Sequence, residues 1–421
     1  MELSHGIGEP AQCVGGCGSC RSRCHRVYQG QMRREEALDQ LYREAEFELG
    51  REQLPLHSAL GRVSAEEVRA AWNVPPAACA SHDGAAFRWA CVSTSGVLEA
   101  GQYTLLGMGR PLPKEYDTLA PYELFRLDGK GRIQFSKIPS RGSGISPAGG
   151  TVQAGDPVIR ENVALEPSHL ALLRSVGAEC VTVWKRPRAA ILPMGKDIAP
   201  LGQAPGPGQF ADGDSLLFQL MVEGLGGTAD ILPVQSGGTD RLAEALSSLA
   251  RQYDLLLLAG GTGNGGEDYG DFAPSAVARA GTVITHGISL RPGGKATLIA
   301  AVERTPVIAF PGPMHAALLM AEQLLPPVLG RFLHQRERER IVVAKSGSAF
   351  PKRDGDAMFF PHVLVSETPE GYAVSAIRMG DGPDTFVRAN GVALLEPGRD
   401  YLPGEMIRVR LLERFSAWGR F

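Results

Sequence analysis

The stretch YDLLLLAGGTGNGGEDY, residues 253–269, decides the fold class of this chain. Its first half is a short apolar run, which is typical of a strand covered on both faces of a parallel sheet. The run then breaks into a glycine-rich loop. Loops that leave the carboxyl ends of parallel strands are where open α/β sheets bind ligands. We therefore expect an α/β domain with a binding site at this loop.

The loop has the composition of an anion site beside a cation site. Its glycines carry no side chain where backbone N–H groups would close around an anion, and the four expected to contact a ligand are Gly260, Gly261, Gly263 and Gly265. Asp268 follows them, and a carboxylate there suits a divalent cation that bridges protein and phosphate. The alternative interpretation is a flexible turn with solvated acids.

The composition excludes several classes of protein. With 421 residues, 43% of them hydrophobic and 21% charged, the chain is an ordinary globular protein with more than one domain. The formal net charge of -3 provides no field for nucleic acid or an acidic membrane. No apolar run approaches the roughly 20 residues of a membrane-spanning helix, and residues 1–10 do not resemble a secretory signal. We expect a cytoplasmic location with neither nucleic acid nor membrane as partner.

The order of strand and helix patterns predicts a multidomain α/β protein. From residue 187 to residue 334 strands alternate with helices, which indicates a doubly wound, mostly parallel sheet. The periodicity also predicts helices over 33–49, 59–71 and 165–176, short strands with a hairpin at 126–133 in the region 80–150, and β structure near the C-terminus. The expected organisation is a Cys-rich appendage at 1–30, an elongated N-terminal α+β domain at 31–72 and 150–186, a small inserted β domain at 73–149, the α/β domain at 187–334 and a barrel-like C-terminal β domain at 340–413.

Further acids and bases follow the other strands of the α/β pattern or precede its helices. Because each lies at a strand's carboxyl end or a helix start, all of them can face one crevice. The acids are Asp197, Asp212 and Asp214, with Asp214 or Ser215 as the expected cap of the helix over 215–224; the bases are Arg291 and Lys295; the last strand contributes Pro311 and Gly312. This mixture suits a nucleotide or pyrophosphate with a bound metal.

The order of these motifs resembles one family, the MoeA proteins and the matching domain of gephyrin, which are molybdopterin molybdenumtransferases. The resemblance runs from about Arg33 to Leu412. It rests on LPLHSALGRV at 54–63, VPP at 74–76 with SHDGAA at 81–86, GRPLP at 109–113, GQFADGD at 208–214, the glycine loop, RPGGK at 291–295 and PGPM at 311–314. Each motif alone is weak evidence, whereas seven in the right order are specific.

The resemblance implies a homodimer that takes adenylylated molybdopterin and molybdate, cleaves the adenylate with a divalent cation such as Mg²⁺, and leaves molybdenum on the dithiolene. Asp268 and Asp212 would then lie near nucleotide and metal. Asp83 would approach from the small β domain of the partner subunit, and Asp197 takes the position of a family glutamate. Arg291 and Lys295 would supply positive charge for the molybdate or the phosphate.

Several motif positions lack the side chain that the resemblance implies, for example an acid at position 144 and a serine at positions 259 and 263. The replacements are His82, Ala85, Met108, Gly144, Gly213, Asp214, Ala259, Gly263, Arg291, Pro313 and Met314, with Lys295 displaced by one position. Each lost hydrogen bond to a charged group is worth about 1.5–3 kcal/mol. Two functions follow: a divergent transferase with altered recognition, or a non-catalytic carrier or maturation factor for molybdopterin or the finished cofactor. Tungstate remains an alternative anion.

The N-terminal appendage has the cysteine density of a soft-metal site. Cys13, Cys17, Cys20 and Cys24 fall within twelve residues, and four thiolates can hold zinc or an iron–sulfur cluster. The family pattern includes no such segment. The presence of this segment favours redox coupling or docking to a molybdoenzyme client, and the alternative is a tail with chance cysteines.

Overall fold

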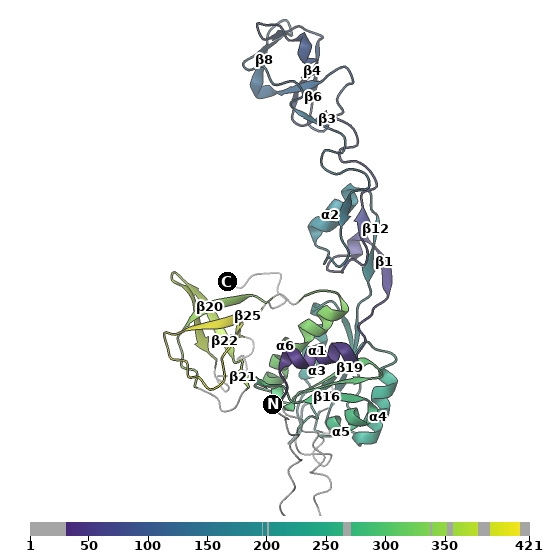
Figure 1. Ribbon diagram of the computed structural model, residues 1–421, viewed down its shortest axis with the longest axis vertical. Coiled ribbons are helices and arrows are strands. Elements are labelled where there is room, and N and C mark those ends of the chain that lie inside the picture. Colours follow the sequence, from purple (N-terminus) through teal and green to yellow (C-terminus); the bar gives the residue numbers. More distant parts are fainter. Residues whose placement is uncertain are drawn as a thin grey trace, which may run out of the picture. The chain divides into compact units, whose positions relative to one another are not determined.

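The computed structural model describes residues 31–195, 197–199, 202–263, 271–336, 339–351, 357–377 and 388–412 (Figure 1). The chain divides into two compact units, one formed by residues 1–49 and 186–421 and the other by residues 50–185. The long apolar runs of the α/β pattern all fall in the first unit. No helix among the described residues is long and apolar enough to cross a membrane.

The first unit is built on a six-stranded sheet in the order β14-β13-β15-β19-β18-β16. Its strands are β13 (Arg188–Pro193), β14 (Thr228–Ile231), β15 (Leu255–Ala259), β16 (Thr282–His286), β18 (Leu298–Val302) and β19 (Thr305–Phe310). The first four in spatial order are parallel, whereas β18 is antiparallel to both of its neighbours, β19 and β16, so that the edge strand β16 again runs in the direction of the first four. The reversed direction of β18 follows from the two-residue turn between β18 and β19, where Glu303 and Arg304 have φ values of 47° and 68°.

Helices cover both faces of this sheet. Alternate strand residues such as Ile191 and Leu257 pack under α1 (Arg34–Glu44), α3 (Asp214–Gly224) and α6 (Met314–Phe332). The intervening residues such as Leu192 and Leu256 pack under α4 (Gly238–Leu249) and α5 (Ala273–Ala280). The strands are therefore apolar on both sides, which confirms the doubly wound, mostly parallel sheet.

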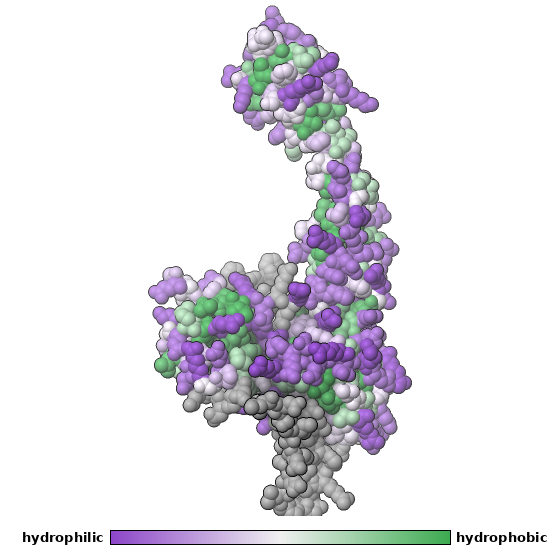
Figure 2. Space-filling model, viewed as in Figure 1, coloured by the Kyte–Doolittle hydropathy of each residue, from purple (hydrophilic) through white to green (hydrophobic). Residues whose placement is uncertain are grey.

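The C-terminal part of this unit is a closed barrel in the order β20-β23-β22-β24-β25. Its strands are β20 (Ile341–Ser346), β22 (His362–Thr368), β23 (Gly371–Ala376), β24 (Gly391–Ala393) and β25 (Met406–Leu411). Figure 2 shows hydrophobic residues on the visible face of the barrel, and its exposed apolar side chains include Val343, Leu402 and Met406. The short strand β21 (Met358–Phe359) pairs with β17 (Leu290–Arg291) of the α/β domain.

The second unit has two parts, of which the first holds one small hydrophobic core and the second holds two. In one, α2 (Pro167–Ser175) packs on the antiparallel pair β1 (Arg51–Pro55) and β12 (Cys180–Trp184), with β2 (Val68–Arg69) paired to β11 (Pro157–Ile159). The other is all β. It consists of β6 (Tyr103–Leu106), β4 (Gly84–Phe87) and β7 (Thr118–Pro121), of β5 (Val97–Leu98), β9 (Ile133–Phe135) and β8 (Phe125–Leu127), and of the pair β3 (Cys79–Ala80) and β10 (Ile145–Ser146). The hairpin expected at 126–133 is present as β8 and β9.

Two expected helices are corrected by the structure. The segment 59–71 is not a helix, because its backbone pairs across the unit: the Ala65 N–H donates to the Thr182 carbonyl at 3.0 Å. The helix expected over 33–49 ends at Glu44, and Ala45 is extended with φ −108° and ψ 163°. This early end lets Phe47 pack on Phe332 of α6 with ring centroids 4.7 Å apart, so tertiary packing overrides local periodicity.

Candidate functional site

Three loops leave the same edge of the parallel sheet. Pro193 of β13 pairs with Ala259 of β15, and Ala259 pairs with Phe310 of β19, so these strands end in register. The Gly260 N–H donates to the Phe310 carbonyl at 3.2 Å, which joins the glycine loop to the last strand. The loops that follow carry the predicted site residues Gly260, Gly261, Gly263, Pro311 and Gly312. The structure thus brings these residues together at one edge.

Glycine is required at the centre of this edge. Gly260 and Gly261 have φ values of 89° and 70°, a region that L side chains rarely adopt. A Cβ on Gly260 would lie 3.4 Å from the Met194 carbonyl oxygen and 3.9 Å from the Gly312 Cα. A Cβ on Gly261 would lie 2.9 Å from the Met194 Cβ. The positive φ values therefore favour glycine at both positions, and at Gly261 a side chain would also meet Met194.

Residues that the sequence analysis missed support the glycine loop. Asp271 Oδ1 accepts the Gly263 N–H at 2.9 Å, and the Thr262 hydroxyl donates to the Phe310 carbonyl at 3.2 Å. His286 is buried, and its Nε2 lies 3.3 Å from the Thr262 carbonyl oxygen. Asp271 had one sequence signal, since it precedes a helix start with Pro274 in the first turn. His286 had none, because its contact depends on tertiary structure.

Asp212 and Asp214 lie at the start of α3. Asp212 Oδ1 accepts the Ser215 N–H at 3.0 Å, so the cap comes from Asp212 rather than from Asp214 or Ser215 as expected. Asp214 Oδ1 is buried and has no hydrogen-bond partner among the described residues. Burial, together with the negative charge of Asp212, raises the pKa of Asp214 to about 6. The pair forms a strained acidic site that a proton or a cation would relieve.

The Asp197 loop pairs with the segment that leads to these acids. The Asp197 carbonyl accepts the Phe210 N–H at 2.8 Å, and Ile198 forms a parallel bridge with Phe210. The Asp197 side chain itself is exposed. Asp197 therefore lies on a loop whose backbone is fixed two residues from Asp212, and the structure brings these two predicted residues into neighbouring loops.

The first turns of α6 contact two of the predicted loops. A Cβ on Gly213 would lie 2.6 Å from the Met314 Cε, so Met314 fills the space that a side chain at 213 would need. A Cβ on Gly293, in the loop that joins Arg291 to Lys295, would lie 3.0 Å from the Ala316 Cβ. The acidic loop and the basic loop thus pack against the first turn of one helix. The backbone of Arg291 also pairs with β21, which sequence reasoning did not reveal.

Asp83 belongs to the second unit and has a local structural role there. Its Oδ1 accepts the Met108 N–H at 2.6 Å, so it joins two of the resemblance motifs. Gly144, where the family has an acid, has φ 73°, and a Cβ there would lie 2.2 Å from the Leu119 carbonyl oxygen. The backbone at this position excludes the family's side chain.

The remaining predicted site residues, Asp268, Gly265, Cys13, Cys17, Cys20 and Cys24, lie outside the described residues. Within the described part of the chain, no group of three or more His, Cys, Asp or Glu side chains is arranged to hold a metal ion.

Comparison with known proteins defines the class to which this fold and site belong. Residues 32–177 match the family described as the MoeA N-terminal region, domains I and II, and residues 175–331 match the probable molybdopterin binding domain. The chain therefore belongs to the class of molybdenum cofactor biosynthesis proteins. More particularly, it is a member of the MoeA family.

The relatives and the structural neighbours agree with this assignment. The molybdopterin molybdenumtransferase of Haemophilus influenzae is 24% identical over 319 residues, which cover 72% of this chain and 78% of that protein. The enzyme of the same name from Bacillus subtilis is 23% identical over 403 residues, 87% of this chain and 91% of that protein. The crystal structure of the molybdopterin biosynthesis MoeA protein from Pyrococcus horikoshii has a TM-score of 0.76 at 24% identity, with 92% of this chain and 100% of that chain covered.

Proposed function

We propose that the chain is a molybdopterin molybdenumtransferase. It takes adenylylated molybdopterin and molybdate, releases AMP, and leaves molybdenum on the dithiolene of molybdopterin. The single observation that carries this proposal is that the loops after β13, β15 and β19 leave the same end of the sheet, and that the loop after β15 turns at Gly260 and Gly261, which both have positive φ. Backbone amides without side chains in front of them suit a phosphate group.

The predicted site residues have distinct proposed roles. The glycine loop with Gly260, Gly261, Gly263 and Gly265 lies against the phosphates, and Pro311 and Gly312 form the opposite wall. The Gly260 and Gly263 N–H groups already donate to the Phe310 carbonyl and to Asp271, so these two glycines bring the backbone close to the ligand rather than donate to it. Arg291 and Lys295 balance the charge of phosphate or molybdate. Asp83 is contributed by the small β domain of the partner subunit in a homodimer. Asp197, Asp212 and Asp268 supply carboxylates near the scissile phosphate. This arrangement stabilises negative charge that develops on a leaving phosphate oxygen.

The acids at the start of α3 fit a divalent cation. The buried Asp214 Oδ1 has no hydrogen-bond partner among the described residues, and carboxylate oxygens are the ligands that Mg²⁺ prefers. We propose that Asp212, Asp214 and Asp268 hold the cation. When bound, it would neutralise charge on the phosphate oxygens. Asp212 is oriented for this by the Ser215 N–H, which occupies one of its oxygens.

A second candidate function is a non-catalytic carrier of molybdopterin or the finished cofactor. One observation favours it: the backbone at Gly144 leaves no room for the acid that the family has there. Against it, Met314 fills the space beside Gly213, and Asp271 occupies the space beside Gly263. At both glycines a neighbouring side chain fills the space left by the replaced residue. We expect such compensation in a site that is still functional.

The cysteine segment has a proposal of its own. We propose that Cys13, Cys17, Cys20 and Cys24 bind zinc or an iron–sulfur cluster and that the segment contacts a molybdoenzyme client. Iron and zinc content after anaerobic purification tests the metal, with a Cys17→Ser/Cys20→Ser variant as control. Equal metal content in both proteins would contradict the proposal.

The transferase proposal is tested with adenylylated molybdopterin, magnesium and molybdate. We expect the intact protein to release AMP and the Asp268→Ala variant to lose release by at least about 100-fold. The matched control is Glu244→Asn on the exposed side of α4, which should release AMP at the parent rate. Tight pterin binding without AMP release would instead establish the carrier.

A further inference from the structure

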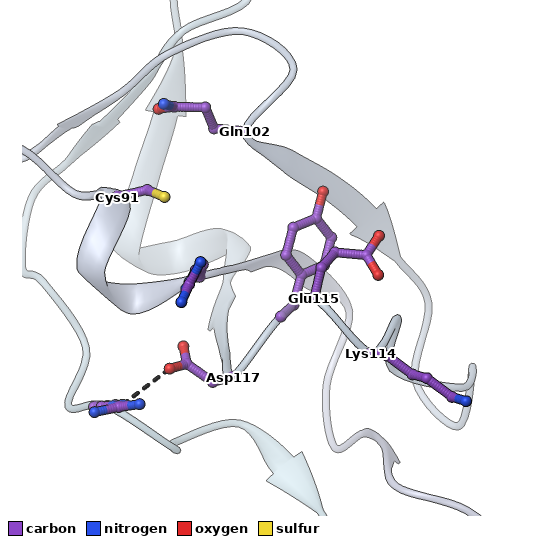
Figure 3. A pocket seen from close by; sticks show the side chains of 8 residues that line it. Cys91, Gln102, Lys114, Glu115 and Asp117 are labelled. Atoms are coloured by element: carbon purple, nitrogen blue, oxygen red, sulfur yellow. Dashed lines mark hydrogen bonds and ion pairs between the residues drawn. The ribbon is translucent and has the colours of Figure 1, made fainter.

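The small β domain contains a hollow that the function proposed above does not use. Its volume is about 510 Å³, within the range of small-molecule sites. The lining residues come from four segments and are all polar or sulfur-containing apart from the Tyr116 ring: Arg88, Cys91, Gln102, Lys114, Glu115, Tyr116, Asp117 and Arg141. Figure 3 shows the Cys91 thiol and the Asp117 carboxylate pointing into the same space.

The walls of this hollow are held in place before any ligand binds. Asp117 Oδ1 accepts the Trp89 N–H at 2.7 Å, and Asp117 Oδ2 accepts the Arg141 Nε–H at 2.9 Å, drawn as a dashed line in Figure 3. The Trp89 indole N–H donates to the Pro139 carbonyl at 2.9 Å. These bonds tie the segments at 88–91, 117–118 and 139–141 together. A preformed site loses less entropy on binding.

The net charge of the side chains that line the hollow is positive. Asp117 and Arg141 neutralise each other at 2.9 Å. Among the described residues, Arg88 and Lys114 make no ion pair, while Glu115 is the other acid of the lining. The hollow thus has a net charge of one positive unit, whereas the whole chain has a formal net charge of -3.

The hollow is distinct from the Asp83 motif of the same domain. In the β4–β7 pair, Phe87 faces Thr118 at one end and Gly84 faces Pro121 at the other. Arg88 and Asp117 follow and precede the first of these pairs, while Asp83 precedes the second. A ligand in the hollow therefore binds at the opposite end of β4 from Asp83.

We propose that this hollow binds a small phosphate-bearing anion. The Arg88 guanidinium offers a planar set of N–H donors, and Lys114 at the rim carries an ammonium on a flexible stem. The Gln102 amide adds a neutral donor, so donors from three segments can meet the oxygens of a tetrahedral anion. The inference does not depend on the transferase proposal, since the two sites share no residue.

Cys91 provides a direct measurement of occupancy. The intact protein is treated with iodoacetamide, an uncharged reagent, in sodium phosphate or in sodium chloride of equal ionic strength, and alkylation is followed peptide by peptide. We expect about 10 mM phosphate to slow alkylation of Cys91 at least about three-fold. Cys180, an exposed thiol outside the small β domain, should react at an unchanged rate. No protection of Cys91 would overturn the proposal.

The protection should depend on the two cations of the hollow. Arg88→Gln/Lys114→Gln should lose it, whereas Arg126→Gln/Lys130→Gln, which removes two exposed cations elsewhere in the domain, should retain it. Equal protection in both variants would contradict the proposal. If the Arg88→Gln/Lys114→Gln variant fails to fold, the single variants Arg88→Gln and Lys114→Gln keep the test decisive, because each should weaken the protection of Cys91 by inorganic phosphate. Protection by malonate but not by phosphate would overturn the assignment of phosphate.

Discussion

Asp271 Oδ1 accepts the Gly263 N–H at 2.9 Å, and its Oδ2 lies 2.5 Å from the position that a Cβ on Gly263 would occupy. The aspartate thus fixes the glycine loop and at the same time excludes a side chain from position 263. This pairing explains why the family's serine is missing there. The replacement is part of a local rearrangement, because the backbone at 263 and the carboxylate at 271 fill one space.

Restoring the serine should therefore damage the loop. Gly263→Ser is expected to lower stability by about 1–3 kcal/mol through overpacking against Asp271. It should also weaken molybdopterin binding, measured by pterin fluorescence. The double variant Gly263→Ser/Asp271→Ala should recover most of the stability. If the single variant is as stable and as tightly binding as the parent, the proposed role of Asp271 is wrong.

The raised pKa of Asp214 makes a prediction about pH. Its folded-state pKa of about 6 lies above the ordinary 3.8, so the folded protein binds this proton more tightly than the unfolded chain does. The group therefore costs stability that appears as pH rises from about 4 to about 6 and persists above that range. Asp214→Asn should stabilise the protein by about 1–2 kcal/mol at neutral pH, after allowance for partial solvent screening.

The stability gain of Asp214→Asn should become smaller as the pH is lowered. Urea unfolding at pH 7.5 and near pH 4.5 measures it, and Glu244→Gln, an exposed acid on α4, serves as the control with little change at either pH. A gain that is equal at both pH values would show that the carboxylate of Asp214 is not responsible. Addition of magnesium should reduce the stability difference between Asp214→Asn and the parent at neutral pH, because a bound cation also offsets the repulsion between Asp212 and Asp214.

Two substitutions of Asp212 separate its capping hydrogen bond from the effect of its charge on the reaction. Asp212→Ala removes the acceptor of the Ser215 N–H and should lower stability by about 1 kcal/mol, measured by urea unfolding. Asp212→Asn keeps a side-chain acceptor and should be nearly as stable as the parent. If the charge of Asp212 matters for the reaction, both variants lose AMP release. Full AMP release by Asp212→Asn would leave Asp212 with only its capping role.

We predict that position 144 cannot accommodate the acidic side chain that the family has there. With φ 73° and a Cβ position 2.2 Å from the Leu119 carbonyl oxygen, Gly144→Asp must displace backbone. We expect a loss of at least about 3 kcal/mol, which limited proteolysis of the small β domain would detect. The control is Gly142→Asp, whose Cβ meets nothing within 4 Å although its φ is also positive at 81°. Similar resistance of Gly144→Asp and the parent would contradict this account.

The sequence was most predictive for those elements that depend on local sequence pattern. The apolar run that became β15 and the glycines at its end are local signals, and both give the expected strand and edge loop. The helix expected over 59–71 was wrong, because small residues at helical spacing there pair through their backbone with distant strands. The antiparallel strand β18 was not predicted either, since a two-residue turn at Glu303 and Arg304 leaves no sequence signature without glycine.

The site was predictable in its position but less so in its contacts. That Asp212 and the glycine loop lie near one sheet edge follows from the order of strands. That Met314 fills the space beside Gly213, or that His286 contacts Thr262, depends on packing between segments far apart in sequence. Such contacts have no periodicity to reveal them. The residue roles of Asp268 and Gly265 stay predictions.

One measurement tests the central claim most directly, namely single-turnover AMP release from adenylylated molybdopterin by the intact protein. With magnesium and molybdate present, we predict that each equivalent of bound pterin yields one equivalent of AMP and that chelation of the divalent cation stops the release. Bound pterin that retains its adenylate under these conditions would contradict the account and leave the protein as a carrier.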